Sequence, residues 1–278
     1  MRFAWRAFLA PVLLLGLAFG AGAARAADRI VTIGSDVTEI AFALGRGGDV
    51  VAADDTSTWP AAATKLPKLG YLRQLAPEPI LAQRPTLLLV SAGAGPEAVL
   101  RQVERAGVRL VLVPDEASAA GVATKVRTIG AALGKAAEAE KLAGAIIAGL
   151  PRAQGPNGPR MMLVLANAPG RVLAAGQDTA GDSFIRLAGG RNSFTAEGYK
   201  PLSAEAAIAA APEILLVPSH VLGLSGGLDA LKRDPILART PAVRTGRVLV
   251  VDSLAALNFG PRLPEAVARL RSDIGKMP

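Results

Sequence analysis

Short apolar runs rich in β-branched residues alternate with amphipathic stretches along most of the chain. The runs that predict strands are 29–33, 50–52, 86–91, 109–113, 161–166, 172–174, 214–217 and 248–251. Helical patterns lie between them, for example from Pro96 to Ala106, where Gly107 ends the pattern. Such alternation predicts an α/β fold with parallel sheets covered by helices.

The middle of the chain has a different pattern. Residues 118–150 are alanine-rich and helical in character, with a break at Gly134, and residues 151–159 have loop composition. A single helix over 136–150 would be about 22 Å long. We therefore expect an N-terminal α/β lobe at 27–134, a connecting helix at 135–152 and a C-terminal α/β lobe at 153–278.

The first residues have the pattern of a secretory signal peptide. Arg2 and Arg6 precede an apolar run of 14 residues, 7–20, and Ala24-Arg25-Ala26 is a small-x-small cleavage pattern. The run is short for a bilayer span, although a retained anchor is the alternative. Removal of 1–26 leaves 252 residues and lowers the formal net charge from +8 to +5, because three arginines are lost. No cysteine is available for lipidation, so we expect a soluble periplasmic protein that is not a lipoprotein.

Composition removes several kinds of chemistry. The chain has no cysteine, which excludes disulfides, thiolate metal sites and cysteine nucleophiles. One histidine argues against zinc or manganese cages, which usually use several imidazoles. Aromatic residues make up only 4%, too few for the stacking surfaces of single-strand nucleic-acid binders. The chemistry of any functional site must therefore use tyrosine, carboxylates, arginine, hydroxyls or the backbone.

The sequence contains an internal repeat. Residues 78–90 (EPILAQRPTLLLV) match 205–217 (EAAIAAAPEILLV) at an offset of 127, and each copy predicts a short helix, a proline stop and a buried strand. Gly70-Tyr71 and Gly198-Tyr199 precede the copies at an offset of 128. A helix, a proline and a strand in this order are common in α/β proteins, so chance similarity is the alternative to a true repeat. A true repeat makes Glu78 and Glu205 equivalent positions in the two lobes.

Three segments carry a family resemblance: 33–45 (IGSDVTEIAFALG), 64–75 (TKLPKLGYLRQL) and 175–179 (AGQDT). They resemble the periplasmic haem-binding proteins of bacterial ATP-driven haem importers, in the helix-linked class that also serves cobalamin and siderophores. The resemblance covers the whole mature chain. It implies two Rossmann-like lobes with mainly parallel sheets, one helical connector and a ligand cleft between the lobes. It also implies a binding protein, not an enzyme, that passes ferric haem to an inner-membrane permease dimer with its ATPase, with an outer-membrane haem receptor system as a further partner and no nucleic acid.

The most specific part of the resemblance is Gly70-Tyr71-Leu72-Arg73, because that tyrosine is the axial ligand of haem iron in the family. Phenolate is a hard anionic donor suited to ferric iron, and tyrosine is a known proximal haem ligand. A phenol ordinarily titrates near pH 10, about three units above neutrality, so the phenolate needs help from the metal and from nearby positive charge. In an extended segment Arg73 would point the same way as Tyr71 and could also bind a haem propionate. Without the resemblance, Tyr71 would be a half-buried loop tyrosine.

The chain departs from the family at one position. Some members supply a second axial histidine from the loop after the first strand of the second lobe, where this chain has Asn167 in 165–170 (LANAPG). An amide is a poor iron ligand, so we expect five-coordinate haem held by Tyr71, or a water in the sixth position. His220 is the sole imidazole and follows the 214–217 strand, but a surface or loop role is favoured for it.

Four further residues have expected roles. Tyr199 pairs with Tyr71 in the repeat, which suggests the pocket wall. Arg262 lies in a turn-rich segment before the last helix and could meet a propionate, cap the helix or face solvent. In the wider class, glutamates at the positions of Glu78 and Glu205 face arginines of the permease, while stabilisation of a helix N-terminus is the plain alternative for both.

Two other functions stay open. Cobalamin or a ferric siderophore is the alternative cargo within the class, because neither requires iron ligation by the protein. An exported α/β enzyme is the remote alternative: residues 91–98 (SAGAGPEA) match G-x-G-x-x-A after a strand, with Asp115 after the next one. Pro96 there has a simpler explanation as a helix-start residue. A hydrolase would have to use His220 as its base, and no G-x-S-x-G elbow supports one.

Overall fold

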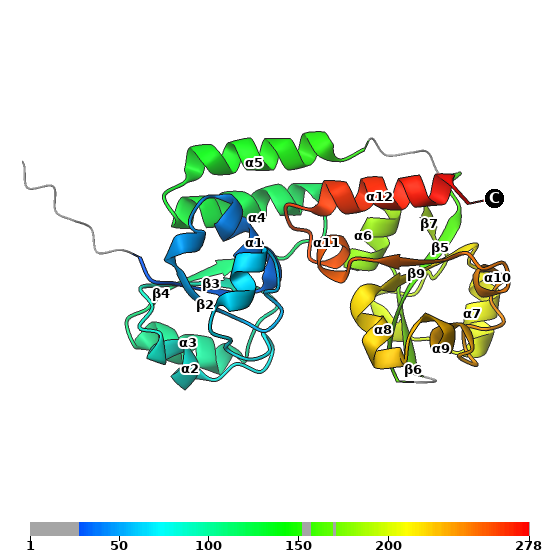
Figure 1. Cartoon of the computed structure of the whole chain (residues 1–278), viewed down its shortest axis with the longest axis horizontal. Helices are drawn as coiled ribbons and strands as arrows, with labels where there is room; N and C mark the ends of the chain where they lie inside the picture. The colour runs from blue at the N-terminus through cyan, green and yellow to red at the C-terminus, as the bar shows by residue number, and fades with distance from the viewer. Residues whose placement is uncertain (1–27, 152–156, 169–170, 278) are drawn as a thin grey trace, which may run out of the picture.

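The structure, a computed structural model, describes residues 28–151, 157–168 and 171–277. Two α/β lobes lie side by side, with α5 (Ala136–Gly149) and α12 (Leu263–Gly275) along one side of the pair (Figure 1). The predicted signal peptide, residues 1–26, is outside the described ranges. Within those ranges, no helix combines the length and the apolar character that a bilayer span requires.

The sheet of the N-terminal lobe has four parallel strands in the order β2-β1-β3-β4. They are β1 (Ile30–Ile33), β2 (Val50–Ala53), β3 (Leu87–Ser91) and β4 (Arg109–Val113). Every residue of β1 and β3 is buried, because the two central strands are covered on both faces, and this explains their nearly continuous apolar sequence. The helical elements are α1 (Ser35–Ala43), η1 (Gly47–Asp49), η2 (Ala61–Lys65), α2 (Pro77–Ala82), α3 (Glu97–Arg105) and α4 (Ala119–Ala132).

The C-terminal lobe has a mixed sheet in the order β10-β9-β5-β6-β8, with β7 paired to β5. Strands β10, β9 and β5 are parallel, whereas β6 is antiparallel to both β5 and β8. The strands are β5 (Arg160–Ala168), β6 (Arg171–Ala175), β7 (Arg191–Asn192), β8 (Tyr199–Pro201), β9 (Ile214–Pro218) and β10 (Val248–Val251). The other helices are α6 (Ala180–Leu187), α7 (Ala204–Ala210), α8 (Ser219–Ser225), α9 (Leu228–Lys232), α10 (Pro241–Arg244) and α11 (Ser253–Leu257).

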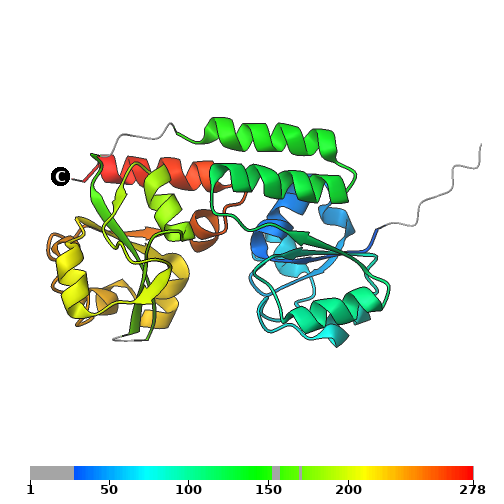
Figure 2. The same cartoon turned by 180° about the vertical axis from the view of Figure 1, so that it is seen from behind.

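The connecting region is a pair of helices. Gly134, with a φ of 67°, separates α4 from α5, and the two helices stack against each other (Figure 2). Gly130 of α4 lies against Ala139 of α5 so closely that a side chain at position 130 would not fit. The predicted helix over 136–150 is present, and α5 also contacts α12 of the second lobe.

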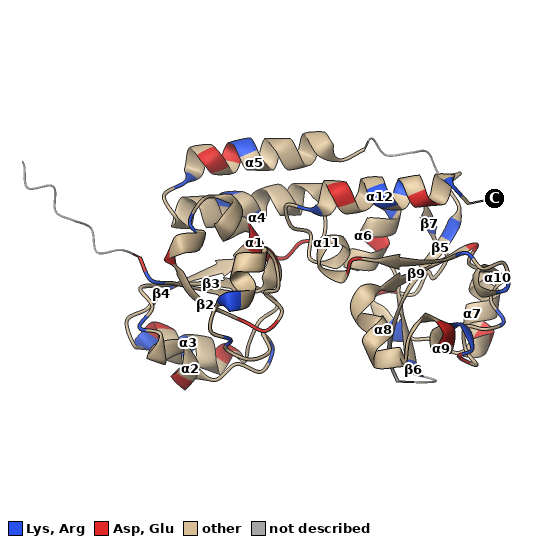
Figure 3. Cartoon of the chain, in the orientation of Figure 1, with Lys and Arg blue, Asp and Glu red and all other residues tan. Residues whose placement is uncertain are grey.

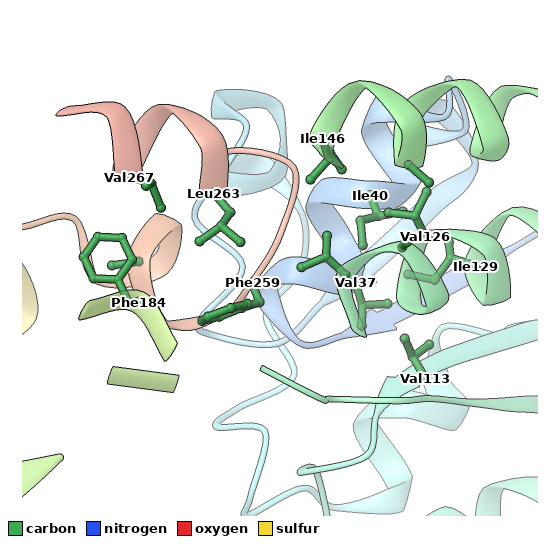
Figure 4. Close-up of a cluster of buried hydrophobic side chains, with 14 of the residues drawn as sticks. Val37, Ile40, Val113, Val126, Ile129, Ile146, Phe184, Phe259, Leu263 and Val267 are labelled. Atoms are coloured by element: carbon green, nitrogen blue, oxygen red, sulfur yellow. The ribbon is translucent and has the colours of Figure 1, made fainter. Parts of the chain in front are cut away.

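One hydrophobic cluster runs across both lobes. Figure 4 shows Val37, Ile40 and Val126 on one side of it and Phe184, Leu263 and Val267 on the other, with Phe259 between them. Phe259 is 1% exposed, so its ring is buried within this cluster. Each lobe also has a smaller cluster of its own, on the face of its sheet that the shared cluster does not cover. Because the largest cluster is shared, apolar packing holds the two lobes in position relative to each other.

Candidate functional site

A cavity of about 730 Å³ lies between the lobes. The N-terminal lobe contributes the start of α1 and the segments that follow β2, β3 and β4, and the C-terminal lobe contributes the starts of α8 and α11. These segments come after the carboxyl ends of parallel strands, where ligands of open α/β sheets usually bind. The volume is in the usual range for a site that takes one organic ligand.

Tyr71 and Arg73 line this cavity from the N-terminal lobe. Arg73 Nη1 donates a hydrogen bond to Tyr71 Oη over 2.8 Å, and the Tyr71 side chain is 41% exposed. The expected extended segment is wrong: the Gln74 N–H donates to the Tyr71 carbonyl over 2.8 Å, which closes a turn. Gly70 directly precedes the turn with a φ of 90°, a conformation that favours glycine. The turn, not a strand, brings the two side chains together.

Carboxylates and a buried lysine form another part of the wall. Asp36 and Asp115 line the cavity, and Lys125 Nζ donates to both of them and to the carbonyl of Asn258, with distances of 3.0 Å to Asp115 and 2.9 Å to the carbonyl. Lys125 has no exposed side-chain surface. Burial by itself lowers its pKa, but the charges of the two carboxylates outweigh burial and raise the pKa, so the ammonium stays charged. Sequence analysis missed this lysine, because its local pattern is that of an ordinary helical lysine.

The C-terminal lobe contributes His220, Ser219 and Ser253 to the cavity. His220 Nδ1 lies 2.7 Å from Ser253 Oγ, and the His220 backbone N–H donates to the same oxygen over 3.0 Å. Ser219 Oγ and Ser253 Oγ are 3.1 Å apart. Sequence analysis favoured a surface or loop role for His220, and the structure shows it exposed at the start of α8, where it lines the cavity.

The two other residues expected at the pocket are Tyr199 and Asn167. Tyr199 begins β8 and is not among the described residues that line the cavity. Burial raises the pKa of its phenol, which hydrogen bonds with Thr179 and the backbone of Gly181 partly offset. Asn167 is in β5, but its side chain is outside what the structure describes.

Arg262 does not line the large cavity, contrary to the role considered for it. It precedes α12, where its Nε donates to Glu39 of α1 over 3.0 Å and its Nη1 donates to Asp252 over 3.2 Å. Its guanidinium carbon lies 4.9 Å from the ring centre of Trp59, in a smaller cavity of about 260 Å³. Glu39 and Trp59 belong to the N-terminal lobe, so Arg262 connects the lobes.

Glu78 and Glu205 occupy equivalent places, as the repeat predicts. Each is the second residue of a short helix, α2 or α7, and each is exposed. Both helices lie on the side of the lobes away from α5, and acidic positions are visible on them in Figure 3. A hydrogen bond from its own backbone and one from Ser203 lower the pKa of Glu205. The glycines at 70 and 198 both have positive φ, which adds to the correspondence between the halves.

Residues 30–255 match the family model described as periplasmic binding protein. The chain belongs to the periplasmic binding protein family. The match includes both sheets and the cavity between them, so the two-lobed fold and the position of the cavity agree with a family whose members bind substrates.

Solved structures similar to this periplasmic binding protein include two haem binders. The periplasmic heme-binding protein BhuT, in complex with two hemes, is 38% identical, with a TM-score of 0.84 over 90% of this chain and 98% of that one. The periplasmic heme-binding protein RhuT from Roseiflexus sp. RS-1, in apo form, is 37% identical, with a TM-score of 0.84 over 89% of this chain and 97% of that one. Both likenesses extend over essentially the whole described fold.

Curated relatives of this periplasmic binding protein have either a lower sequence identity or a shorter matching segment. An uncharacterized ABC transporter substrate-binding lipoprotein, YvrC of Bacillus subtilis, is 24% identical over 256 residues, which are 88% of this chain and 79% of YvrC. A vitamin B12-binding protein of Yersinia pestis is 34% identical over 85 residues, which are 31% of this chain and 30% of that protein.

Proposed function

We propose that this protein captures ferric haem between its lobes in the periplasm and delivers it to an inner-membrane ABC permease. The observation that carries the proposal is the Tyr71 hydroxyl in the cavity wall, in a 2.8 Å hydrogen bond with Arg73. The whole-length likeness to two heme-binding proteins supports haem as the cargo.

Tyr71 and Arg73 together suit a ferric porphyrin. The phenolate is the hard oxygen donor, and the adjacent guanidinium favours its ionised form. Arg73 uses one N–H on Tyr71, which leaves other donors of its planar group for a propionate. Arg73 is the one lysine or arginine among the described residues that line the cavity, whereas Asp36, Asp115 and Asp252 are acidic. A propionate near those aspartates would be repelled, so Arg73 also fixes which edge of the haem enters first.

The test is a hemin titration of the mature protein followed by absorption spectroscopy. Tyr71→Phe removes the hydroxyl alone and should abolish the phenolate-to-iron charge-transfer band. Its binding should weaken by at least the roughly tenfold that loss of a supporting partner costs a metal site. Tyr199→Phe is the matched control, because it alters the other tyrosine, which is outside the cavity, and should leave the spectrum unchanged.

An unchanged haem spectrum in Tyr71→Phe would refute the ligand assignment. Cobalamin is the second candidate cargo, because a local stretch of the chain is similar to a vitamin B12-binding protein. If the protein is saturated by cobalamin and does not bind hemin, the cargo is cobalamin and not haem, and the proposed transport role stands.

Delivery involves the side of the two lobes that faces away from α5. Glu78 and Glu205 form an exposed pair, one in each lobe and each near a helix start, so a permease with two similar subunits could contact both. Exposed ion pairs are individually weak, and this suits a surface that must orient the loaded protein and then release it. We assign the two glutamates to permease docking on this basis.

A further inference from the structure

The glycine motif at 91–98 fits a dinucleotide site by its sequence, but the structure gives it other neighbours. Gly93 lines the 730 Å³ cavity between the lobes, and Asp115, which follows the next strand, lines the same cavity. In a dinucleotide site the pyrophosphate lies at the start of the helix after the glycines. Within the described ranges no residue of α3 lines the cavity, and Glu97 in its first turn would repel a phosphate. The glycine loop therefore belongs to the cavity between the lobes.

Backbone hydrogen bonds join this loop to the turn that carries Tyr71. The Gly95 N–H donates to the Leu72 carbonyl over 2.9 Å. The Gly95 carbonyl accepts from the Leu75 N–H over 3.1 Å. These two bonds fix the loop relative to the turn, so Gly93 has a defined place beside the same turn.

Gly93 lies between a cation and a carboxylate of the cavity wall. A Cβ at position 93 would be 3.9 Å from Arg73 Nη2 and 3.8 Å from Asp115 Oδ2, which are ordinary contact distances. Gly93 is exposed, and it is not one of the glycines with a positive φ. A side chain would thus fit the fold at this position. The need for glycine must come from the cavity and not from the conformation of the loop.

A side chain at position 93 would take space that a ligand of Arg73 needs. Arg73 uses Nη1 on Tyr71 Oη, so Nη2 remains for a carboxylate of the haem, at about 3 Å. A side chain would begin 3.9 Å from that nitrogen and extend into the cavity. On the other side of the glycine, Lys125 Nζ holds Asp115 through Oδ1 over 3.0 Å. Asp115 limits how far an anionic group can move past Arg73, because like charges repel.

We propose that Gly93 is a specificity-determining residue for haem. The edge of the porphyrin that Arg73 holds lies against the bare backbone of Gly93, and a side chain at this position would exclude that edge. Glycine commonly serves the close approach of a backbone to a ligand. The inference rests on the proposed function, because it needs haem in the cavity. It also gives the glycine motif a role in a binding protein.

The experiment compares hemin titrations of the mature wild type with those of Gly93→Ala, Gly93→Val and Gly93→Leu. Binding should weaken in that order, slightly for alanine and at least about tenfold for leucine, since an added side chain must displace the ligand or strain the site. Thermal unfolding midpoints should stay at the wild-type value, because a Cβ at position 93 meets only ordinary contacts. If leucine lowers the midpoint, valine carries the comparison.

Gly144→Leu is the matched control. Gly144 is exposed on α5, has open space around it and does not line the cavity. Its hemin affinity should equal that of the wild type.

A double-mutant cycle with Arg73→Ala separates exclusion of the haem edge from a general disturbance of the site. Gly93→Leu should weaken hemin binding much less in the Arg73→Ala background than in the wild type, because the edge is no longer held there. Additive effects would overturn the inference, and so would a wild-type hemin affinity in Gly93→Leu. The proposed function stands in both cases. If hemin does not bind the wild type at all, the proposed function itself fails.

Discussion

Lys125 is a fully buried cation with three acceptors from different parts of the chain. Asp36 belongs to α1, Asp115 follows β4, and the Asn258 carbonyl comes from the second lobe. Burial raises the pKa of Asp36, and the ammonium of Lys125 opposes that rise. Each of these charges is tolerable only in the presence of its partner, because an uncompensated buried charge is costly.

Substitution of this lysine should therefore be severe. Lys125→Met keeps most of the side-chain volume but leaves Asp36 without its counter-charge, so we expect a loss of about 3–5 kcal/mol in the free energy of unfolding. Urea denaturation followed by circular dichroism measures it. Addition of Asp36→Asn should recover part of the loss, and Lys135→Met, which alters an exposed pair with Glu138, should change little. Equal stabilities for Lys125→Met and Lys135→Met would contradict the importance of the buried cluster.

The sequence predicted some of the site's residues but not all of their surroundings. Tyr71 and Arg73 were found from a motif, yet their contact arises from a turn that residue alternation did not indicate. Lys125 could not be found, because its partners are 89, 10 and 133 residues away in sequence. Arg262 was considered for a propionate because a turn before a helix does not reveal that its guanidinium meets Glu39 of the other lobe and Asp252 of its own.

At the scale of elements, the repeat accounts for α2 and α7 with their following strands, β3 and β9. The two helices reach the same position by different local means. Ser203 accepts the Ala206 N–H at the start of α7, whereas α2 starts with Pro77 and no side-chain cap. The two helices are capped differently, yet each has a glutamate as its second residue. Stabilisation of the helix end therefore does not by itself explain why Glu78 and Glu205 occupy the same position.

Charge removal at these helices tests the docking role. Glu78→Ala combined with Glu205→Ala should reduce haem transport into proteoliposomes that contain the cognate permease and ATPase, while hemin affinity stays the same. Each single substitution should have a smaller effect, because one lobe still docks. Glu97→Ala is the control, because Glu97 is also exposed and in the first turn of a helix, α3. Normal transport by the double variant would contradict the assignment of Glu78 and Glu205 to permease docking.

Strand prediction succeeded where apolar runs were long enough to show periodicity. The eight expected strands are all present, with ends displaced by at most two residues. The sequence missed β7 and β8, which have two and three residues and no apolar run. The mixed pairing of the second sheet also escaped prediction, because the direction of β6 and β8 depends on turns and partners and not on the pattern within each strand.

At the scale of the whole molecule, polar contacts supplement the shared apolar cluster between the lobes. Arg262 binds Glu39 across the junction, and Asn258 contacts both Ser35 and Lys125. Burial raises the pKa of Glu39, and Arg262 opposes that rise. These contacts favour small movements of the lobes over a wide closure.

Loss of Arg262 should loosen the pair of lobes. Arg262→Met leaves Glu39 with an uncompensated charge, so we expect a loss of about 3 kcal/mol in unfolding free energy at neutral pH. Because the folded-state pKa of Glu39 is raised, the folded protein binds its proton more readily than the unfolded chain does. Arg262 lowers this pKa in the wild type, so the loss should be full above the still higher Glu39 pKa of the variant and shrink as the pH falls through it.

Urea titrations at several pH values measure this difference, and small-angle X-ray scattering of the variant should show a larger radius of gyration. Arg269→Met, on the exposed surface of α12, is the control. A constant loss at every pH would show that the Glu39 charge is not its source.

The stacking of Trp59 on Arg262 gives the molecule an intrinsic optical reporter. The sequence has two tryptophans, and Trp5 is in the predicted signal peptide, so its removal would leave Trp59 as the sole indole. Its ring comes from one lobe and the cation beneath it from the other, and the ring is 47% exposed. Separation of the lobes would remove the guanidinium and hydrate the indole, which shifts its fluorescence emission to longer wavelength. Opening and closing can thus be followed in the unlabelled protein during encounter with its transporter.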